Sequence, residues 1–211
     1  MKPAFRDRAA AGRSLARALE RFRGSAALAL AIPSGGVPVA AEIARALSLP
    51  LDVAPVSKVL LPWTTESGYG AVAFDGSVWI DEEAASRYSL SRAQIDKGIA
   101  QARAKVERRK ERLRGARPAP ELSGRPVILV DDGIAAGSTM RTAIAALRKH
   151  APAQIVVAVP TAHDRSIAAI RGLADEVVCP DVRGGASFAV ADAYEIWRDV
   201  DEEDAAALLG L

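Results

Sequence analysis

The sequence has little of what several classes of protein depend on. Its 211 residues include one cysteine, Cys179, two histidines and only 5% aromatic residues. A single cysteine excludes an intramolecular disulfide framework and a multi-cysteine zinc site. The two histidines, His150 and His163, are separated in the chain and do not form a metal-binding motif.

Charge of one sign and long apolar runs are also lacking. The 28 Lys and Arg residues nearly balance 26 Asp and Glu, so no overall basic field favours nucleic acid or a membrane surface. No stretch approaches the ~20 consecutive apolar residues of a membrane-spanning helix. Near the N-terminus, Arg13, Arg17 and Glu20 interrupt the apolar stretch that a signal peptide would require. We therefore expect a cytoplasmic protein that does not associate with membranes.

What is present is a globular composition, half of it apolar. Runs of consecutive apolar residues are typical of strands that are buried on both faces of a parallel sheet. Five such runs occur, at 26–32, 51–56, 127–130, 155–159 and 177–179. Helical patterns follow three of them, at 37–47, 138–150 and 164–173. This alternation predicts an α/β fold in which helices flank a mostly parallel sheet.

Two segments interrupt the alternation. Residues 63–80 predict a long loop followed by a hairpin around Asp75-Gly76. Residues 91–114 predict a long polar helix that Ser91 caps and Gly115 ends. Its basic residues are interpreted as a solvated face, because no aromatic side chain lies between them to stack on bases, which disfavours nucleic acid as a partner.

The segment from Val127 to Met140 carries the chemistry. A buried strand ends in Asp131 and Asp132, a loop of small residues follows, and Ser138 and Thr139 open a helix. Ligands of open α/β sheets bind at the carboxyl ends of the strands, and a helix N-terminus suits a phosphate. The two carboxylates would repel that phosphate, so they should serve hydroxyl groups or a metal. A 5-phosphorylated ribose presents a phosphate and a diol at this spacing.

Other phosphate-binding motifs are absent. The chain has no Gly-Lys-Ser/Thr of a Walker A loop, and residues 34–39 lack the third glycine of a dinucleotide fingerprint. The alternative without function is a strand-to-helix turn with a solvated carboxylate pair. That alternative does not explain why a carboxylate pair, a glycine, a loop of small residues and a hydroxyl pair follow one another in this order.

Residues 130–139 resemble the phosphoribosyl-pyrophosphate signature of the type I phosphoribosyltransferases. Residues 30–40 resemble the first, pyrophosphate-binding loop of that family, and Val56-Ser57-Lys58 resembles the start of its flexible catalytic loop. Residues 188–204 resemble the C-terminal end of a poorly characterised branch. The resemblance implies a five-stranded core in a single domain over 1–211, with an insertion at about 63–120 and a hood over the base site at about 180–211. Residues 68–72 are interpreted as part of a lid over the substrate.

The resemblance also implies roles for individual residues. Asp131 and Asp132 would bind the ribose hydroxyls and stabilise an oxocarbenium-like transition state, and Lys58 would neutralise the departing pyrophosphate. Mg²⁺ would arrive with the pyrophosphate rather than on direct protein ligands. The 5-phosphate would be bound by Ala135, Ala136, Gly137, Ser138 and Thr139. The pyrophosphate would be bound by the loop Ser34, Gly35 and Gly36. The aromatic residues of the hood would be Phe188, Tyr194 and Trp197, and they either stack on a base or pack the helix expected at 201–209 against the core.

Three positions depart from the family pattern. Ala136 stands where the signature commonly has Thr, Ser34 where many relatives carry Arg or Lys, and Ala135 where 6-oxopurine enzymes place an Asp. Two functions stay open. One is a phosphoribosyltransferase that uses phosphoribosyl pyrophosphate and Mg²⁺ on a nitrogen of an unidentified acceptor; the other is a non-catalytic regulatory protein that senses this compound or a nucleoside monophosphate. A homo-oligomer is compatible with either.

Overall fold

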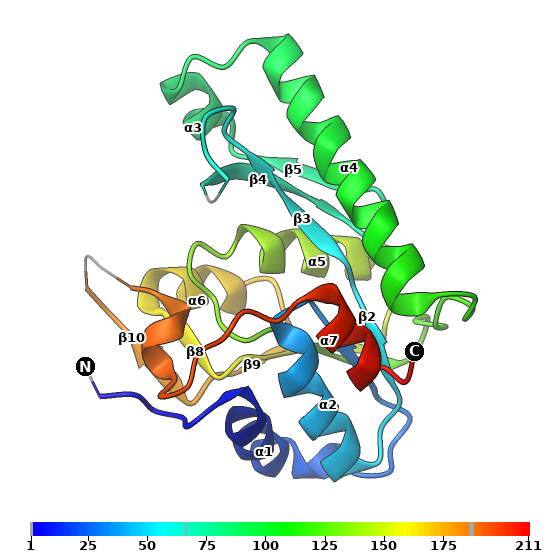
Figure 1. Cartoon of the computed structure of the whole chain (residues 1–211). Helices are drawn as coiled ribbons and strands as arrows, with labels where there is room; N and C mark the ends of the chain where they lie inside the picture. Colours follow the sequence, from blue (N-terminus) through cyan, green and yellow to red (C-terminus); the bar gives the residue numbers. More distant parts are fainter. Residues whose placement is uncertain (1, 66, 186–187) are drawn as a thin grey trace.

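The computed structural model describes residues 2–65, 67–185 and 188–211, and its core is a five-stranded parallel sheet (Figure 1). The strand order is β2-β1-β6-β7-β9. The strands are β1 (Leu28–Ala31), β2 (Leu51–Val53), β6 (Pro126–Val130), β7 (Gln154–Ala158) and β9 (Glu176–Val178). Each of them falls on or overlaps one of the five apolar runs, so the predicted fold class is confirmed.

Helices cover both faces of this sheet, which explains why its strands are apolar throughout. In β6, Val127 and Leu129 pack in one cluster with α5 (Ser138–Lys149) and α6 (Asp164–Arg171). The intervening Ile128 and Val130 pack in a second cluster with α1 (Arg8–Ala18), α2 (Gly36–Leu47) and α7 (Glu202–Leu208). The predicted helices at 37–47, 138–150, 164–173 and 201–209 are thus present with small shifts at their ends.

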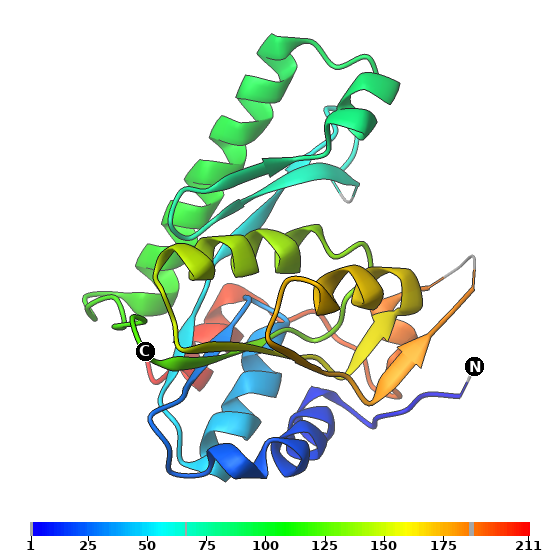
Figure 2. The same ribbon diagram turned by 180° about the vertical axis from the view of Figure 1, so that it is seen from behind.

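A second layer lies on the far side of α5 from the parallel sheet (Figures 1 and 2). It is an antiparallel sheet in the order β3-β4-β5, covered by two helices. In β4, Ala71 and Ala73 join the core cluster that includes α5, whereas Val72 packs in the cluster that includes α4. The elements of this layer are β3 (Val56–Leu60), β4 (Gly68–Ala73), β5 (Val78–Ile80), α3 (Glu82–Arg87) and α4 (Arg92–Arg114).

This layer corrects part of the interpretation of residues 56–80. The segment 68–72, interpreted as part of a lid, is the central strand of the antiparallel sheet, and 56–58 begins a strand rather than a flexible loop. The predicted hairpin is confirmed, since Gly76 turns with φ +83° and the Asp75 carboxylate accepts the amide of Ser77 at 2.8 Å. Small and β-branched residues in β4 allow the strand to pack between two helices. The two glycines of β4 are typical of a loop, so the sequence does not reveal a strand here.

The long helix α4 begins and ends where the sequence predicts. Ser91 and Gln94 form a reciprocal capping box: the Ser91 hydroxyl accepts the Gln94 amide at 3.3 Å, and the Gln94 side chain accepts the Ser91 amide at 2.9 Å. Gly115 ends the helix with φ +60°. Among the described helices, none combines the length and the apolarity needed to cross a membrane.

The N-terminal segment pairs with a stretch of the C-terminal part of the chain. The amides of Ala4 and Phe5 are donated to the carbonyl of Ala193, at 3.0 and 2.9 Å, and Phe5 bridges to Tyr194. The C-terminal part comprises β8 (Thr161–His163), β10 (Asp181–Arg183), the 3₁₀ helix η2 (Val190–Ala193) and α7; a second 3₁₀ helix, η1 (Glu20–Phe22), follows α1. The predicted hood at about 180–211 includes residues 186 and 187, which lie outside the described residues, and the hood and insertion boundaries stay predictions.

Candidate functional site

The site begins where β6 ends, at two adjacent carboxylates. Asp131 and Asp132 follow Val130 directly, and an Asp131 carboxylate oxygen accepts the amide of Asp132 at 2.9 Å. Both side chains line a pocket of about 850 Å³ at the carboxyl edge of the sheet. Parallel strands bring their carboxyl ends to one edge, so the residues that follow β6 meet those that follow β1.

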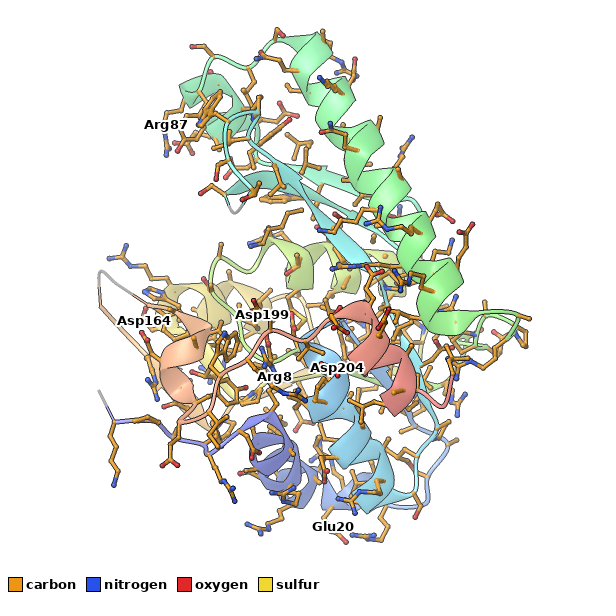
Figure 3. All side chains as sticks on the ribbon, viewed as in Figure 1. Arg8, Glu20, Arg87, Asp164, Asp199 and Asp204 are labelled. Carbon is orange, nitrogen blue, oxygen red and sulfur yellow. The ribbon has the colours of Figure 1, made fainter. Side chains whose placement is uncertain are left out.

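Asp132 is held by an arginine from the first turn of α1. The Arg8 Nε donates to one Asp132 carboxylate oxygen at 2.9 Å, and Nη2 forms an ion pair with the same oxygen at 2.8 Å; Nη1 donates to the carbonyl of Arg198 at 2.7 Å. The guanidinium lies over the Trp197 ring at 3.8 Å from its centroid. Figure 3 shows Arg8 directed toward the C-terminal segment that carries Asp199. Both ends of the chain therefore fix this carboxylate.

The two carboxylates differ electrostatically. Burial raises the pKa of Asp131 well above its ordinary value, and the charge of Asp132 raises it further. Burial also raises the pKa of Asp132, but the Arg8 guanidinium opposes that shift. Because Arg8 stabilises the ionised form of Asp132, we assign the first proton that the pair takes up to Asp131.

The loop between β1 and α2 lies directly against this pair. A Cβ on Gly35 would stand 2.1 Å from an Asp132 carboxylate oxygen, and one on Gly36 would stand 2.8 Å from the Val130 carbonyl. Glycine is thus favoured at 35 by the close approach of the Asp132 carboxylate and required at 36 by the backbone of Val130 and Asp131. The Gly36 amide is already donated to the Ile32 carbonyl at 3.1 Å, so in this conformation backbone donors for a pyrophosphate would have to come from Ser34 and Gly35.

Residues 135–139 connect the carboxylates to the N-terminus of α5. Gly137 precedes the helix in the left-handed region, with φ +82° and no side-chain cap, and the first turn of α5 carries no acidic residue. The amides of that turn therefore have no helical acceptor, and the positive end of the helix dipole faces the pocket. Ala135, Ala136, Gly137, Ser138 and Thr139 all line the pocket.

Neighbouring elements hold this loop in place. The Ile134 amide is donated to the Thr161 carbonyl at 3.0 Å, and Ile134 accepts the amide of His163 at 2.9 Å. The Ser166 hydroxyl donates to the carbonyl of Ala135. Gly133 lets the C-terminal segment approach, since a Cβ there would lie 2.5 Å from a Val190 methyl group. The loop is thus anchored on both sides before a ligand binds.

The opposite wall of the pocket is cationic. Lys58 of β3 lines it together with Lys105 and Arg109, which reach it from α4. Arg109 pairs with Glu202 of α7 at 3.2 Å. The interpretation of the α4 basic residues as a solvated face is wrong for Arg109, which is half-buried in an ion pair, whereas Lys105 is exposed and also lines the pocket.

The three hood aromatics occupy different environments. Trp197 lines the pocket and covers Arg8. The Tyr194 ring is buried, its hydroxyl donates to the Asp132 carbonyl at 2.6 Å, and burial raises the pKa of Tyr194, which keeps it a neutral donor. Phe188 packs edge-on against His163, with ring centroids 5.7 Å apart. A base-stacking role stays a prediction for each of them, with Trp197 the best placed.

Sequence reasoning missed Arg8, Lys105 and Arg109. Arg8 is separated from Asp132 by most of the chain, and no local pattern marks it among the other arginines of the N-terminal segment. The two α4 cations stand in a dense basic run, in which a helical-wheel count does not show which side meets the core. All three are identified as site residues only by their contacts in the folded structure.

The chain belongs to the phosphoribosyl transferase family: the family model for the phosphoribosyl transferase domain matches residues 7–193. Two Mycobacterium tuberculosis proteins, from strains CDC 1551 and H37Rv, are each 37% identical over 205 residues, which cover 97% of this chain. Both are named "putative phosphoribosyl transferase". The aligned region is 46% of each of them, so the chain spans about half the length of these curated relatives.

A solved structure is similar over nearly the whole chain. The crystal structure of a Thermus thermophilus protein is 37% identical, covers 99% of this chain and 98% of its own, and superposes with a TM-score of 0.79. The likeness therefore includes the antiparallel layer and the C-terminal segment as well as the core.

Proposed function

We propose that the chain is a phosphoribosyltransferase that uses phosphoribosyl pyrophosphate with Mg²⁺ and joins the sugar to a nitrogen of an acceptor base or a related compound. One observation carries the proposal. A helix N-terminus that favours an anion and a pair of carboxylates that favours hydroxyl groups lie side by side in one pocket. Family membership supports the reaction class, and the acceptor stays open.

In this proposal the α5 end binds the 5-phosphate. The backbone amides at its first turn donate to the phosphate oxygens, the left-handed Gly137 lets them converge, and Ser138 and Thr139 add hydroxyl donors. Ala136 adds none, so the backbone supplies most of the binding. The anchoring of this loop in the free protein reduces the entropy cost of binding.

The carboxylates then act on the ribose. Asp131 and Asp132 accept hydrogen bonds from the 2- and 3-hydroxyls, and their charge stabilises the positive character that develops on the ring as the bond to pyrophosphate breaks. The electron pair of that bond leaves with the pyrophosphate, and the acceptor nitrogen forms the new bond to C1. Arg8 orients Asp132 and favours its ionised form, and both of its contacts are to the same carboxylate oxygen, which leaves the other oxygen for a hydroxyl of the substrate.

The chemistry of the site fits a Mg²⁺ ion that comes with the substrate. Mg²⁺ commonly binds through one or two carboxylates, with waters and phosphate oxygens completing its shell. Asp131 is an oxygen ligand of the kind it prefers, and the ion would neutralise charge on the leaving pyrophosphate.

The direct test measures pyrophosphate release. The protein is incubated with phosphoribosyl pyrophosphate and Mg²⁺, and a panel of purine and pyrimidine bases is screened with a coupled pyrophosphate assay. Release that depends on one acceptor, and is lost in both Asp131→Asn and Asp132→Asn, supports the proposal. No release with any acceptor, despite calorimetric binding of the substrate, would overturn it.

That second outcome defines the other candidate, a regulatory protein that senses phosphoribosyl pyrophosphate or a nucleoside monophosphate. The observation in its favour is that an Asp132 oxygen is already occupied by Arg8, and that residue 34 carries no cation. Under this alternative, the protein catalyses no reaction, and the Asp131→Asn and Asp132→Asn changes weaken only the binding of the ligand.

A further inference from the structure

The cationic wall of the pocket is assembled by the antiparallel layer. Lys58 extends from β3, which pairs with β4, and Lys105 and Arg109 lie about one turn apart on α4, on the side that meets β3. Figures 1 and 2 both show α4 passing along this layer above the core. Three cations from two elements thus face the same space as Asp131 and Asp132.

These cations are not equally compensated. Arg109 pairs with Glu202 at 3.2 Å and also donates to the carbonyls of Pro33 and Val56, both at 3.4 Å. Lys58 and Lys105 have no carboxylate within ion-pair distance in the described part of the chain. Arg109 therefore joins α4 to Pro33, directly before the pyrophosphate loop. The ammonium groups of Lys58 and Lys105 are exposed in the pocket and make no ion pair with a described residue.

Lys105 shows the electrostatic cost of this arrangement. Partial burial lowers its pKa, and the nearby charges of Arg109, Arg108 and Lys58 lower it further, with Glu202 opposing them. Like charges gathered in a pocket are destabilising unless a ligand neutralises them. An anion that binds between Lys58 and Lys105 would remove that cost.

We propose that Lys105, acting beside Lys58, binds the pyrophosphate group of the substrate. This inference rests on the proposed function. The 5-phosphate occupies the α5 end, and the two carboxylates at the floor repel a second anion, so the second anionic group goes to the cationic wall. The loop at 33–36 contains no cationic side chain, and α4 supplies from outside the core the charge that this loop lacks.

The assignment also gives the antiparallel layer a role. Substrate would contact the core through its phosphate and ribose and the outer layer through its pyrophosphate. The hydrogen bond from Arg109 to the Pro33 carbonyl links this outer layer to the core.

The test compares two anions on matched variants. Inorganic pyrophosphate and ribose 5-phosphate are titrated calorimetrically into the native protein, into Lys105→Gln and into Lys110→Gln. Lys110 lies on the same helix, pairs with Glu107 at 3.0 Å and does not line the pocket, so its variant controls for a change of net charge. Circular dichroism and thermal melts verify that each variant is folded.

We expect Lys105→Gln to weaken pyrophosphate binding by about tenfold to a hundredfold, the usual effect of losing a hydrogen bond to a charged group. Ribose 5-phosphate should bind within about twofold of the native value, and Lys110→Gln should match the native protein for both anions. Equal pyrophosphate affinity in Lys105→Gln and native protein would overturn the inference, as would equal weakening of both anions or no pyrophosphate binding by the native protein. Ribose 5-phosphate binding to the native protein tests the proposed function separately.

Discussion

The two walls of the pocket are built in opposite ways. The core wall is one continuous segment, 131–139, which offers backbone amides and two adjacent carboxylates. The outer wall consists of long side chains from β3 and α4, elements separated by two strands and a helix. Ligand binding at the core wall depends on a few backbone dihedral angles. Ligand binding at the outer wall depends on the charge of the side chains and tolerates small changes in the backbone that carries them.

The largest effect should follow a change to the backbone of the core wall. Gly137→Val places a branched residue at φ +82° and crowds the phosphate, so we expect binding of ribose 5-phosphate to be lost. Gly124→Val is the matched control, because Gly124 has φ +64° and lies outside the pocket lining. The control should lose stability and keep affinity in the same calorimetric titration. Unchanged affinity in Gly137→Val would contradict the assignment of the phosphate loop.

The next effect concerns the ion pair behind the core wall. Arg8→Met leaves the Asp132 carboxylate enclosed without its counter-charge, and we expect a loss of about 3 kcal/mol in the free energy of unfolding, measured by urea denaturation. The pKa of Asp132 in the folded state then rises further above its unfolded value, so the loss should grow as pH rises through that folded pKa.

Arg114→Met is the control for this variant. Arg114 pairs with Asp52 at 3.3 Å, is buried to a similar degree and lies outside the pocket lining. Both variants should lose stability, but only Arg8→Met should lower the rate of pyrophosphate release at saturating substrate. Equal rates in the two variants would show that Arg8 is structural only.

A smaller effect is expected for a single hydroxyl at the phosphate. Thr139→Ala removes one hydrogen bond to a charged group and should weaken ribose 5-phosphate by about 1.5–3 kcal/mol, or roughly tenfold to a hundredfold. Thr142→Ala removes a hydroxyl from the same helix that donates to the Ser138 carbonyl at 2.8 Å and does not line the pocket. If both variants bind equally well, the backbone alone holds the phosphate.

The smallest effect is expected for a change at Asp131, and it should increase the free energy of unfolding rather than decrease it. Asp131 has a pKa that is raised in the folded state, so it is destabilising once it ionises, and stability is lost as pH rises through its folded pKa. Asp131→Asn should therefore stabilise the protein by about 1 kcal/mol at neutral pH while lowering turnover, as expected of a residue kept for function. Thermal melts from pH 4 to pH 8 test this, and a variant less stable than the native protein throughout would show that the cost is absent.

The contrast between the walls also explains what the sequence reveals. The five strands, the flanking helices α2, α5, α6 and α7 and the segment 131–139 are visible because burial on both faces and a strand-to-helix turn leave contiguous patterns, whereas α1 is not predicted from the sequence. Residues 68–72 are interpreted from the sequence as part of a lid because Gly68 and Gly70 are typical of a loop, whereas in the structure backbone and side-chain atoms of β5 fill the space at Gly70. Arg8 and Lys105 become site residues only through contacts between distant parts of the chain, and a single sequence contains no local trace of those contacts.

The central claim is that a phosphorylated ribose binds with its phosphate at the start of α5 and its hydroxyls at the carboxylate pair. Backbone amide chemical shifts, followed by NMR while ribose 5-phosphate is added, test it most directly. We predict the largest changes at residues 136–139, smaller ones at Asp131 and Asp132, and none in α3 or β5. Changes centred on the antiparallel layer, with residues 136–139 unaffected, would contradict it.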